Sequence, residues 1–265
     1  GSIITPLKDR ISSQILTHYP PDPATAAEIT LAEASIDRDV PGVMISDDLR
    51  LLIEEVTFAA RESELVDQAS GVSARVAISA LELLASNLER RALRLGESPV
   101  HARLCDLHML LPAITGKVEM VYEGEQQGPE VVARQIIGEA VKKVFERAFP
   151  AVGRELGSGG EDDTGPYSEI VAWFAEGNSL TLSDEMPFHE YRAALAGVPG
   201  LLELGATYGD GEAATCLGAE IVLEGLHQHL KLARQDLDSQ VSYREMVKFQ
   251  LLKPRRRGPR REDVH

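Results

Sequence analysis

Two long stretches of this sequence repeat their apolar residues every three or four positions, and this spacing restricts the fold more than any other feature. In the stretch ISDDLRLLIEEVTFAARES (45–63), the apolar repeat runs through Leu49, Leu52, Ile53, Val56, Ala59 and Ala60. In VAISALELLASNLERRALRLGE (76–97), it runs through Val76, Ala80, Leu84, Leu88 and Leu95. Such a repeat is typical of an α-helix with one buried face, so the sequence predicts two amphipathic helices.

The ends of these two helices carry recognisable signals. Ser46 is placed as an N-cap, and two aspartates follow it in the first turn. Gly96 is placed as the C-terminal stop of the second helix. A short polar residue before a helix and a glycine after it satisfy the backbone groups that the helix leaves unpaired. The boundaries are therefore predicted along with the helices.

Further helices are predicted along the rest of the chain. A proline-broken entry precedes a short helix at 29–38, and another helix is expected to end near Pro112. The other predicted helices lie at 130–149, after Pro129, at 167–177, at 186–197 with Ser183 as the candidate cap, and at 211–234. Only SLTLSD (179–184) alternates like a strand. With 265 residues and 43% hydrophobic content, we expect a mainly α protein with at least one proper core.

The helices group into two predicted domains. The first comprises residues 29–117 and forms a compact helical bundle. The second, at 118–252, is also helical and contains GRELGSGGEDDTGP (153–166), which has the composition of a flexible loop. The proline- and arginine-rich segment 253–265 is expected to be a disordered tail.

The charge of the chain is unevenly distributed. The net charge is −15, while residues 253–265 carry six basic and two acidic side chains, or +4, so residues 1–252 carry −19. An acidic body repels nucleic acid and anionic membranes, so we expect neither as a partner of residues 1–252. The basic tail could touch nucleic acid or an acidic partner surface, or serve only as a solubilising tether. No apolar run is long enough to span a bilayer and no signal peptide is apparent, so we expect a cytoplasmic protein.

Motifs for covalent or metal chemistry are missing from the sequence. It contains no GxxxxGK[ST] phosphate loop and no Ser-His-Asp or Cys-His arrangement. His227 and His229 are two positions apart on a predicted helix, a spacing that points them to different sides, so we expect no metal site there. Cys105 and Cys216 lie far apart without a CxxC spacing and are interpreted as buried thiols.

Two arginines stand out by position. Arg10 lies in TPLKDRI, between apolar residues. Arg75 ends SGVSAR (70–75) and opens the predicted helix 76–97. A cation at a helix N-terminus opposes the helix dipole by roughly a few tenths of a kcal/mol. Arg75 is therefore either incidental or required at that place.

The segments around both arginines resemble motifs of one family. TPLKDRI resembles the L-x-x-x-x-L-D-R-F segment near the end of the nucleotide-binding core in AAA+ ATPases of the MoxR and magnesium-chelatase subunit I group, although Ile11 stands where that family has an aromatic residue. SGVSAR resembles its G-x-S-x-R sensor-2 motif, and the order of the two motifs matches. The stretches GVSARVAISALELLASNLERRAL, LHMLLPAITGKVEMVYEGEQQGPE and LEGLHQHLKL are similar to bacterial proteins labelled magnesium-chelatase-like or sigma-54-interacting ATPases.

The resemblance implies a domain plan and two site residues. Residues 1–28 would be the end of the AAA+ core, 29–117 the helical lid, and 118–252 an accessory helical domain. Arg10 would be an arginine finger acting on a neighbouring subunit's ATP. Arg75 would be the sensor 2 that contacts the γ-phosphate of bound ATP.

The resemblance also implies cofactors and partners. The full-length protein would bind ATP and Mg²⁺, form a hexameric ring of identical subunits, and remodel a protein client. The family's phosphate loop and Mg²⁺-binding strand lie upstream of the arginine-finger segment, where this chain begins. We therefore expect the chain alone to bind no nucleotide tightly and to be inactive. The alternative is a non-enzymatic helical scaffold that binds a protein partner through residues 120–252.

Overall fold

The computed structural model describes residues 9–13, 15–36, 42–149, 165–237 and 240–246. Most of these residues lie in helices, so the prediction of a mainly α fold is confirmed. The predicted tail 253–265 and nearly all of the predicted loop 153–166 lie outside the described residues. No helix among the described residues is long and apolar enough to cross a membrane.

The first half of the chain forms a helical group with one short two-stranded sheet. Its elements, in chain order, are α2 (Pro23–Glu33), β1 (Val43–Met44), α3 (Asp47–Glu62), α4 (Arg75–Leu95), β2 (Val100–His101), η1 (Leu104–Leu110) and α5 (Leu111–Thr115). Helix α3 packs against both α2 and α4. Strands β1 and β2 pair in parallel, with Val43 opposite Val100, and so join the residues before α3 to the residues after α4.

The second half adds helices and an antiparallel sheet. Its elements are α6 (Tyr122–Gln127), α7 (Pro129–Ala148), η2 (Gly165–Tyr167), α9 (Ser168–Ala175), β3 (Leu180–Ser183), α10 (Phe188–Ala196), α11 (Leu201–Gly205), α12 (Glu212–Gln228), β4 (Leu232–Leu237) and β5 (Gln240–Glu245). The strand order is β3-β5-β4, and Tyr243 of the central strand lies opposite Leu180 and Arg234.

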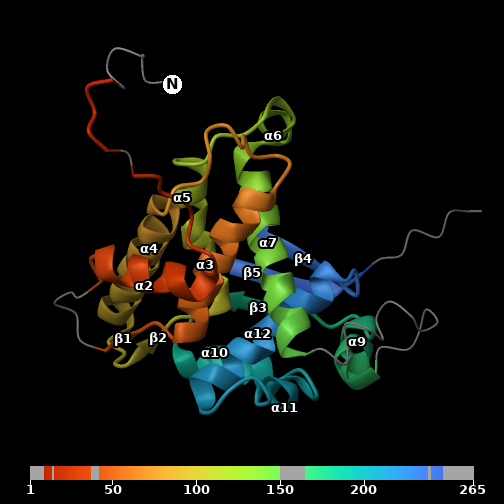
Figure 1. The fold of residues 1–265 in the computed structure, drawn as a ribbon. Helices are drawn as coiled ribbons and strands as arrows, with labels where there is room; N and C mark the ends of the chain where they lie inside the picture. The colour runs from red at the N-terminus through yellow and green to blue at the C-terminus, as the bar shows by residue number, and fades with distance from the viewer. Residues whose placement is uncertain (1–8, 14, 37–41, 150–164, 238–239, 247–265) are drawn as a thin grey trace, which may run out of the picture.

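One hydrophobic core contains residues from both halves. Helix α7 packs against α3 on one side and against α12 on the other, and Figure 1 shows α7 between the orange and blue parts of the ribbon. Val56 of α3, Ile136 of α7 and Ile221 of α12 are all buried in this core. Segments on the two sides of residues 117/118 pack directly together. The domain boundary predicted there stays a prediction.

The two strongest helix predictions are confirmed in detail. Helix α3 starts after Ser46, whose hydroxyl oxygen accepts a hydrogen bond from the Leu49 N–H at 3.3 Å. All six predicted apolar positions of α3 are buried. Helix α4 begins at Arg75 and ends before Gly96, which has a φ of 66°. A left-handed residue after the last turn is the usual role of glycine at this position.

Four local predictions were wrong, each for a physical reason. The first helix begins at Pro23 rather than residue 29, because Asp22 caps it and proline is compatible with a first turn. For the same reason Pro112 lies near the start of α5, and that helix continues to Thr115. Ser183 does not cap α10, since its hydroxyl oxygen accepts from the Glu185 N–H instead. The last helix ends at Gln228, and residues 232–237 form a strand.

Candidate functional site

Arg75 is the first residue of α4 and its side chain is exposed. The N-cap residue, Ala74, offers no side chain to the unpaired N–H groups, and the first turn holds no acidic residue. Within the described part of the chain, the Arg75 guanidinium forms no hydrogen bond or ion pair, while its backbone N–H donates to the Ser73 hydroxyl oxygen at 3.3 Å. The helix entrance therefore presents an unneutralised cation to solvent.

The turn before Arg75 is held by residues distant in sequence. The Val72 N–H donates to the Tyr19 hydroxyl oxygen at 3.0 Å. The Val72 carbonyl oxygen accepts from Arg61 Nε at 3.2 Å. The Arg61 guanidinium carbon lies 4.1 Å from the centre of the Tyr19 ring, which is cation–π distance. Both backbone polar groups of Val72 are thus fixed by side chains from two other segments.

Arg10 lies apart from this turn. Its side chain is exposed, and the first described residues run away from the packed body (Figure 1). Among the described residues, no hydrogen bond or ion pair joins Arg10 to Arg75. The two arginines are therefore not brought together within one copy of this chain, and their predicted roles stay predictions.

A buried polar cluster stiffens the other end of α4. Arg91 and Asp106 form a two-pronged ion pair, and Arg91 also donates to the Asp184 carbonyl oxygen at 2.9 Å. Asn87 Nδ2 donates to carboxylate oxygens of Asp106 and Asp184, at 3.1 and 3.0 Å. Arg91, Asn87 and both aspartates are all at most 2% exposed. The cluster ties α4 to η1 and to the residues after β3.

This cluster was not predicted from the sequence. One signal was present: Asn87 and Arg91 interrupt the apolar face of a helix that otherwise shows Leu84 and Leu88 there. Polar groups on a buried face need partners, because leaving them unpaired costs free energy. Asp106 lies 15 residues after Arg91, and Asp184 lies 97 residues after Asn87. Sequence spacing could therefore not identify these partners.

Glu220 of α12 is a second buried acid. Its carboxylate accepts from the backbone N–H groups of Leu104 and Cys105, at 2.7 and 3.1 Å, and from the Tyr191 hydroxyl at 2.6 Å. Burial raises the pKa of Glu220 to about 7, and these donors oppose that rise. Glu220 thereby caps the start of η1 from another part of the chain.

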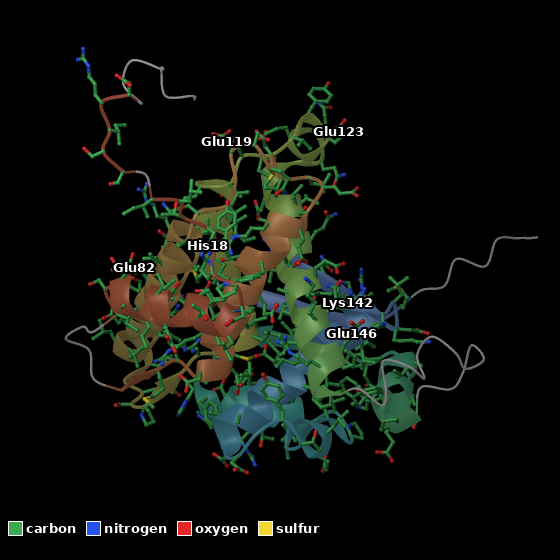
Figure 2. The ribbon with its side chains drawn as sticks, in the orientation of Figure 1. His18, Glu82, Glu119, Glu123, Lys142 and Glu146 are labelled. Carbon is green, nitrogen blue, oxygen red and sulfur yellow. The ribbon has the colours of Figure 1, made fainter. Side chains whose placement is uncertain are left out.

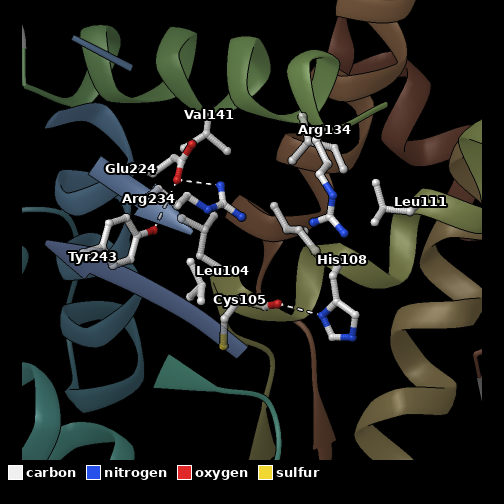
Figure 3. Close-up of a pocket in the computed structure, with 12 residues that line it drawn as sticks. Leu104, Cys105, His108, Leu111, Arg134, Val141, Glu224, Arg234 and Tyr243 are labelled. Carbon is white, nitrogen blue, oxygen red and sulfur yellow. Dashed lines mark hydrogen bonds and ion pairs between the residues drawn. The ribbon is translucent and has the colours of Figure 1, made fainter. Parts of the chain in front are cut away.

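A small pocket lies between η1, α5, α7 and the β4–β5 pair (Figure 3). Half of the residues that line it are aliphatic, and Arg134, Arg234 and His108 also line it. Arg234 is already paired with Glu224 and Asp236, at 2.7 Å each, and Arg134 is paired with Glu130 at 2.7 Å. The cavity volume is about 30 Å³, which is room for about one water molecule. Neither its size nor its neutralised charges suit a nucleotide.

The histidines and cysteines considered in the sequence analysis lie outside this pocket, except Cys105, and each has its own neighbours. His227 Nδ1 lies 3.1 Å from the Leu232 carbonyl oxygen, and His229 Nε2 lies 3.5 Å from Glu146. Both cysteines are free thiols; Cys216 is buried as predicted, whereas Cys105 is half-buried, and burial raises the pKa of each. In the part of the chain that the structure describes, no three His, Cys, Asp or Glu side chains are grouped to hold a metal ion.

Comparisons with known proteins give no relative: no family model, no curated protein and no solved structure matches this chain.

Proposed function

We propose that this chain is the lid and accessory region of an ATPase of the AAA+ type, similar to the MoxR and magnesium-chelatase subunit I group, and that it couples ATP hydrolysis to remodelling of a protein client. In this proposal the nucleotide, with Mg²⁺, occupies a core encoded upstream of Arg10. The subunits assemble into a ring, and Arg75 contacts the γ-phosphate.

The observation that carries the proposal is the entrance of α4. Arg75 is exposed there with no partner among the described residues, on a 21-residue helix whose first turn has neither a capping side chain nor an acid. The Arg75 and Val76 N–H groups donate to Ser73, and the helix dipole still favours an anion at such an end. A guanidinium adds a charge-assisted, two-pronged contact to phosphate. One phosphate would thus be attracted by the helix dipole and would pair with the arginine that the dipole disfavours.

The anchoring of α4 supports a lever role. The Arg91–Asp106 pair and the Asn87 contacts fix the C-terminal half of α4 to η1 and to the segment after β3. A contact made by Arg75 would therefore move α4 together with the rest of the body. A rigid connection of this kind is one physical means of coupling nucleotide to client.

Arg10 is proposed as the arginine finger in trans. Its side chain is exposed and the first described segment extends away from the packed body (Figure 1), so it is accessible to a neighbouring subunit. Arginine fingers supply about 10³- to 10⁵-fold in turnover, because they neutralise charge in the transition state.

The first experiment measures ATP binding by calorimetry with this chain and with a version extended upstream in its reading frame. The chain alone should bind ATP in the millimolar range at best and show no hydrolysis above background. The extended protein should bind ATP in the micromolar range and contain a GxxxxGK[ST] loop. Micromolar binding by the chain alone, or an upstream sequence without such a loop, contradicts the proposal and favours the non-enzymatic scaffold.

The second experiment tests the role in trans by mixing two inactive variants of the extended protein. Arg10→Ala should keep its ATP affinity and lose turnover by about 10³-fold. Mixed with a variant that lacks the phosphate-loop lysine, it should recover activity, since some interfaces would combine an intact finger with an intact loop. A mixture that co-assembles on a sizing column but stays inactive contradicts the role in trans.

A further inference from the structure

We propose that Tyr19 is a latch that fixes the turn before α4 and thereby positions Arg75; the latch stands on the geometry below, and its effect on nucleotide rests on the proposed function. Tyr19 belongs to the irregular segment after Arg10, far in sequence from the turn that it holds. Figure 2 shows the preceding residue, His18, against the helical body. The latch would connect the segment that carries Arg10 to the start of α4, which carries Arg75.

Four contacts build the latch. The Tyr19 hydroxyl oxygen accepts from the Val72 N–H, and the Val72 carbonyl oxygen accepts from Arg61 Nε. The Arg61 guanidinium lies near both the Tyr19 and Phe58 rings, with its carbon 4.1 and 5.0 Å from their centres. Gly71 has a φ of 72°, and a Cβ at this position would lie 2.5 Å from the Tyr19 hydroxyl oxygen. A glycine therefore makes room for the tyrosine.

The location of these contacts gives the latch its effect. Val72 is 1% exposed and packs in the core three residues before Arg75. The next residues lead directly into α4, where the Val76 N–H donates to the Ser73 carbonyl oxygen at 3.1 Å. Fixing both polar groups of Val72 restricts the backbone path to Arg75. Without the Tyr19 hydroxyl, the turn would sample more conformations, and Arg75 would lose more conformational entropy on meeting a phosphate.

The aromatic ring and the hydroxyl can be separated by substitution. Tyr19→Phe keeps a ring for Arg61 and removes only the acceptor of the Val72 N–H. Tyr122→Phe is the matched control, because Tyr122 is 73% exposed on α6. Each variant removes one tyrosine hydroxyl group and nothing else.

The first readout is hydrogen exchange of the Val72 amide in this chain, followed by NMR with ¹⁵N-valine labelling. Tyr19→Phe should accelerate exchange at Val72 by about tenfold, since the amide loses its hydrogen-bond acceptor. Tyr122→Phe should leave it unchanged. Unchanged exchange in Tyr19→Phe overturns the latch. This readout involves no nucleotide, so it stands or falls independently of the proposed function.

The second readout is a double-mutant cycle for ATP affinity in the upstream-extended protein. Tyr19→Phe should weaken ATP binding by about threefold in the wild-type background and have no effect in an Arg75→Ala background, because a positioning residue acts only through the residue that it positions. Equal effects in both backgrounds overturn the positioning role. If Arg75→Ala itself leaves ATP affinity unchanged, the proposed function and the positioning role both fail, while faster Val72 exchange still establishes the latch.

Discussion

Arg91 and Asp106 form two parallel ion-pair contacts in the interior, with Nη1 2.7 Å from Oδ1 and Nη2 3.1 Å from Oδ2. Arg91 is 1% exposed and Asp106 is 0% exposed. Asp106 also accepts from the Arg103 backbone N–H at 2.8 Å, so the carboxylate organises the start of η1 as well as α4. Buried charges of this kind are tolerated because each has a partner.

Removing one charge of this pair should be costly. We expect Asp106→Asn to lower the free energy of unfolding by about 3–5 kcal/mol, because it leaves the Arg91 guanidinium buried without its paired carboxylate. The control is Asp47→Asn on the exposed Asp47–Arg50 pair, which should cost less than about 1 kcal/mol. Urea denaturation followed by circular dichroism measures both. Similar small effects for the two variants would contradict a structural role for the buried pair.

The contrast between Arg91 and its neighbours shows what the sequence could predict here. Leu84 and Leu88 follow the helical period, so the existence, limits and buried face of α4 could be read from spacing alone. Arg91 lies on the same face, which indicates a buried charge but not its partner. The partner Asp106 belongs to a 3₁₀ helix placed by tertiary packing, and local patterns do not encode such pairings.

The stability of the protein should depend on the ionisation of Glu220. Its pKa is about 7 in the folded protein and 4.5 as the ordinary value, so the folded state binds the proton more tightly. The free energy of unfolding should therefore fall by about 3 kcal/mol as pH rises from 4.5 through 7. Glu220→Gln should flatten this part of the profile. Urea midpoints at about pH 5, 6, 7 and 8 test it, and parallel profiles for wild type and variant would refute the assignment to Glu220.

Gly71 should be sensitive to substitution for two reasons. Alanine at Gly71 would have an unfavourable φ of 72° and would place Cβ 2.5 Å from the Tyr19 hydroxyl oxygen. Gly96 has a similar φ of 66°, but a Cβ added there would meet nothing within 4 Å, so Gly96→Ala reports the backbone strain alone. We expect about 1 kcal/mol for Gly96→Ala and about 1 kcal/mol more for Gly71→Ala, because the Tyr19 side chain must shift and lose its hydrogen bond to the Val72 N–H.

The excess should disappear when the tyrosine is removed. In a Tyr19→Ala background, Gly71→Ala should cost no more than Gly96→Ala does. Thermal denaturation of these variants and their combinations measures this. An excess that persists without Tyr19 would show that the crowding comes from another neighbour.

The sheet shows a different limit of sequence analysis. In β5, Val241 and Tyr243 are buried in alternation with more exposed neighbours, which is a strand signal. The preceding apolar repeat of α12 continues at helical spacing as far as Ala233, so the sequence alone favours a longer helix over a strand at 232–237. Leu230, which has a positive φ, follows the end of the helix, and the sequence has no glycine or asparagine there to predict that end. Pairing of β5 with β3, far earlier in the chain, depends on the tertiary fold.

The site was predicted only in part. SGVSAR indicated a turn followed by a helix that opens with Arg75, and the structure has this arrangement. The residues that hold the turn, Tyr19 and Arg61, come from segments 53 and 11 residues before Val72. Neither shows a distinctive pattern in the sequence. Contacts of one side chain with one backbone group leave no periodic trace.

The central claim is that Arg75 contacts the γ-phosphate of bound ATP. Steady-state ATP hydrolysis by the upstream-extended protein tests it most directly. Arg75→Ala should lower turnover by at least about tenfold, because a charge-assisted contact to phosphate is lost. Helix content and Tm should stay unchanged, since the side chain is exposed and has no partner among the described residues. Arg94→Ala, an exposed arginine in the last turn of the same helix, should retain wild-type turnover. Wild-type hydrolysis in Arg75→Ala, or a loss of activity explained by a lower Tm, would contradict the claim.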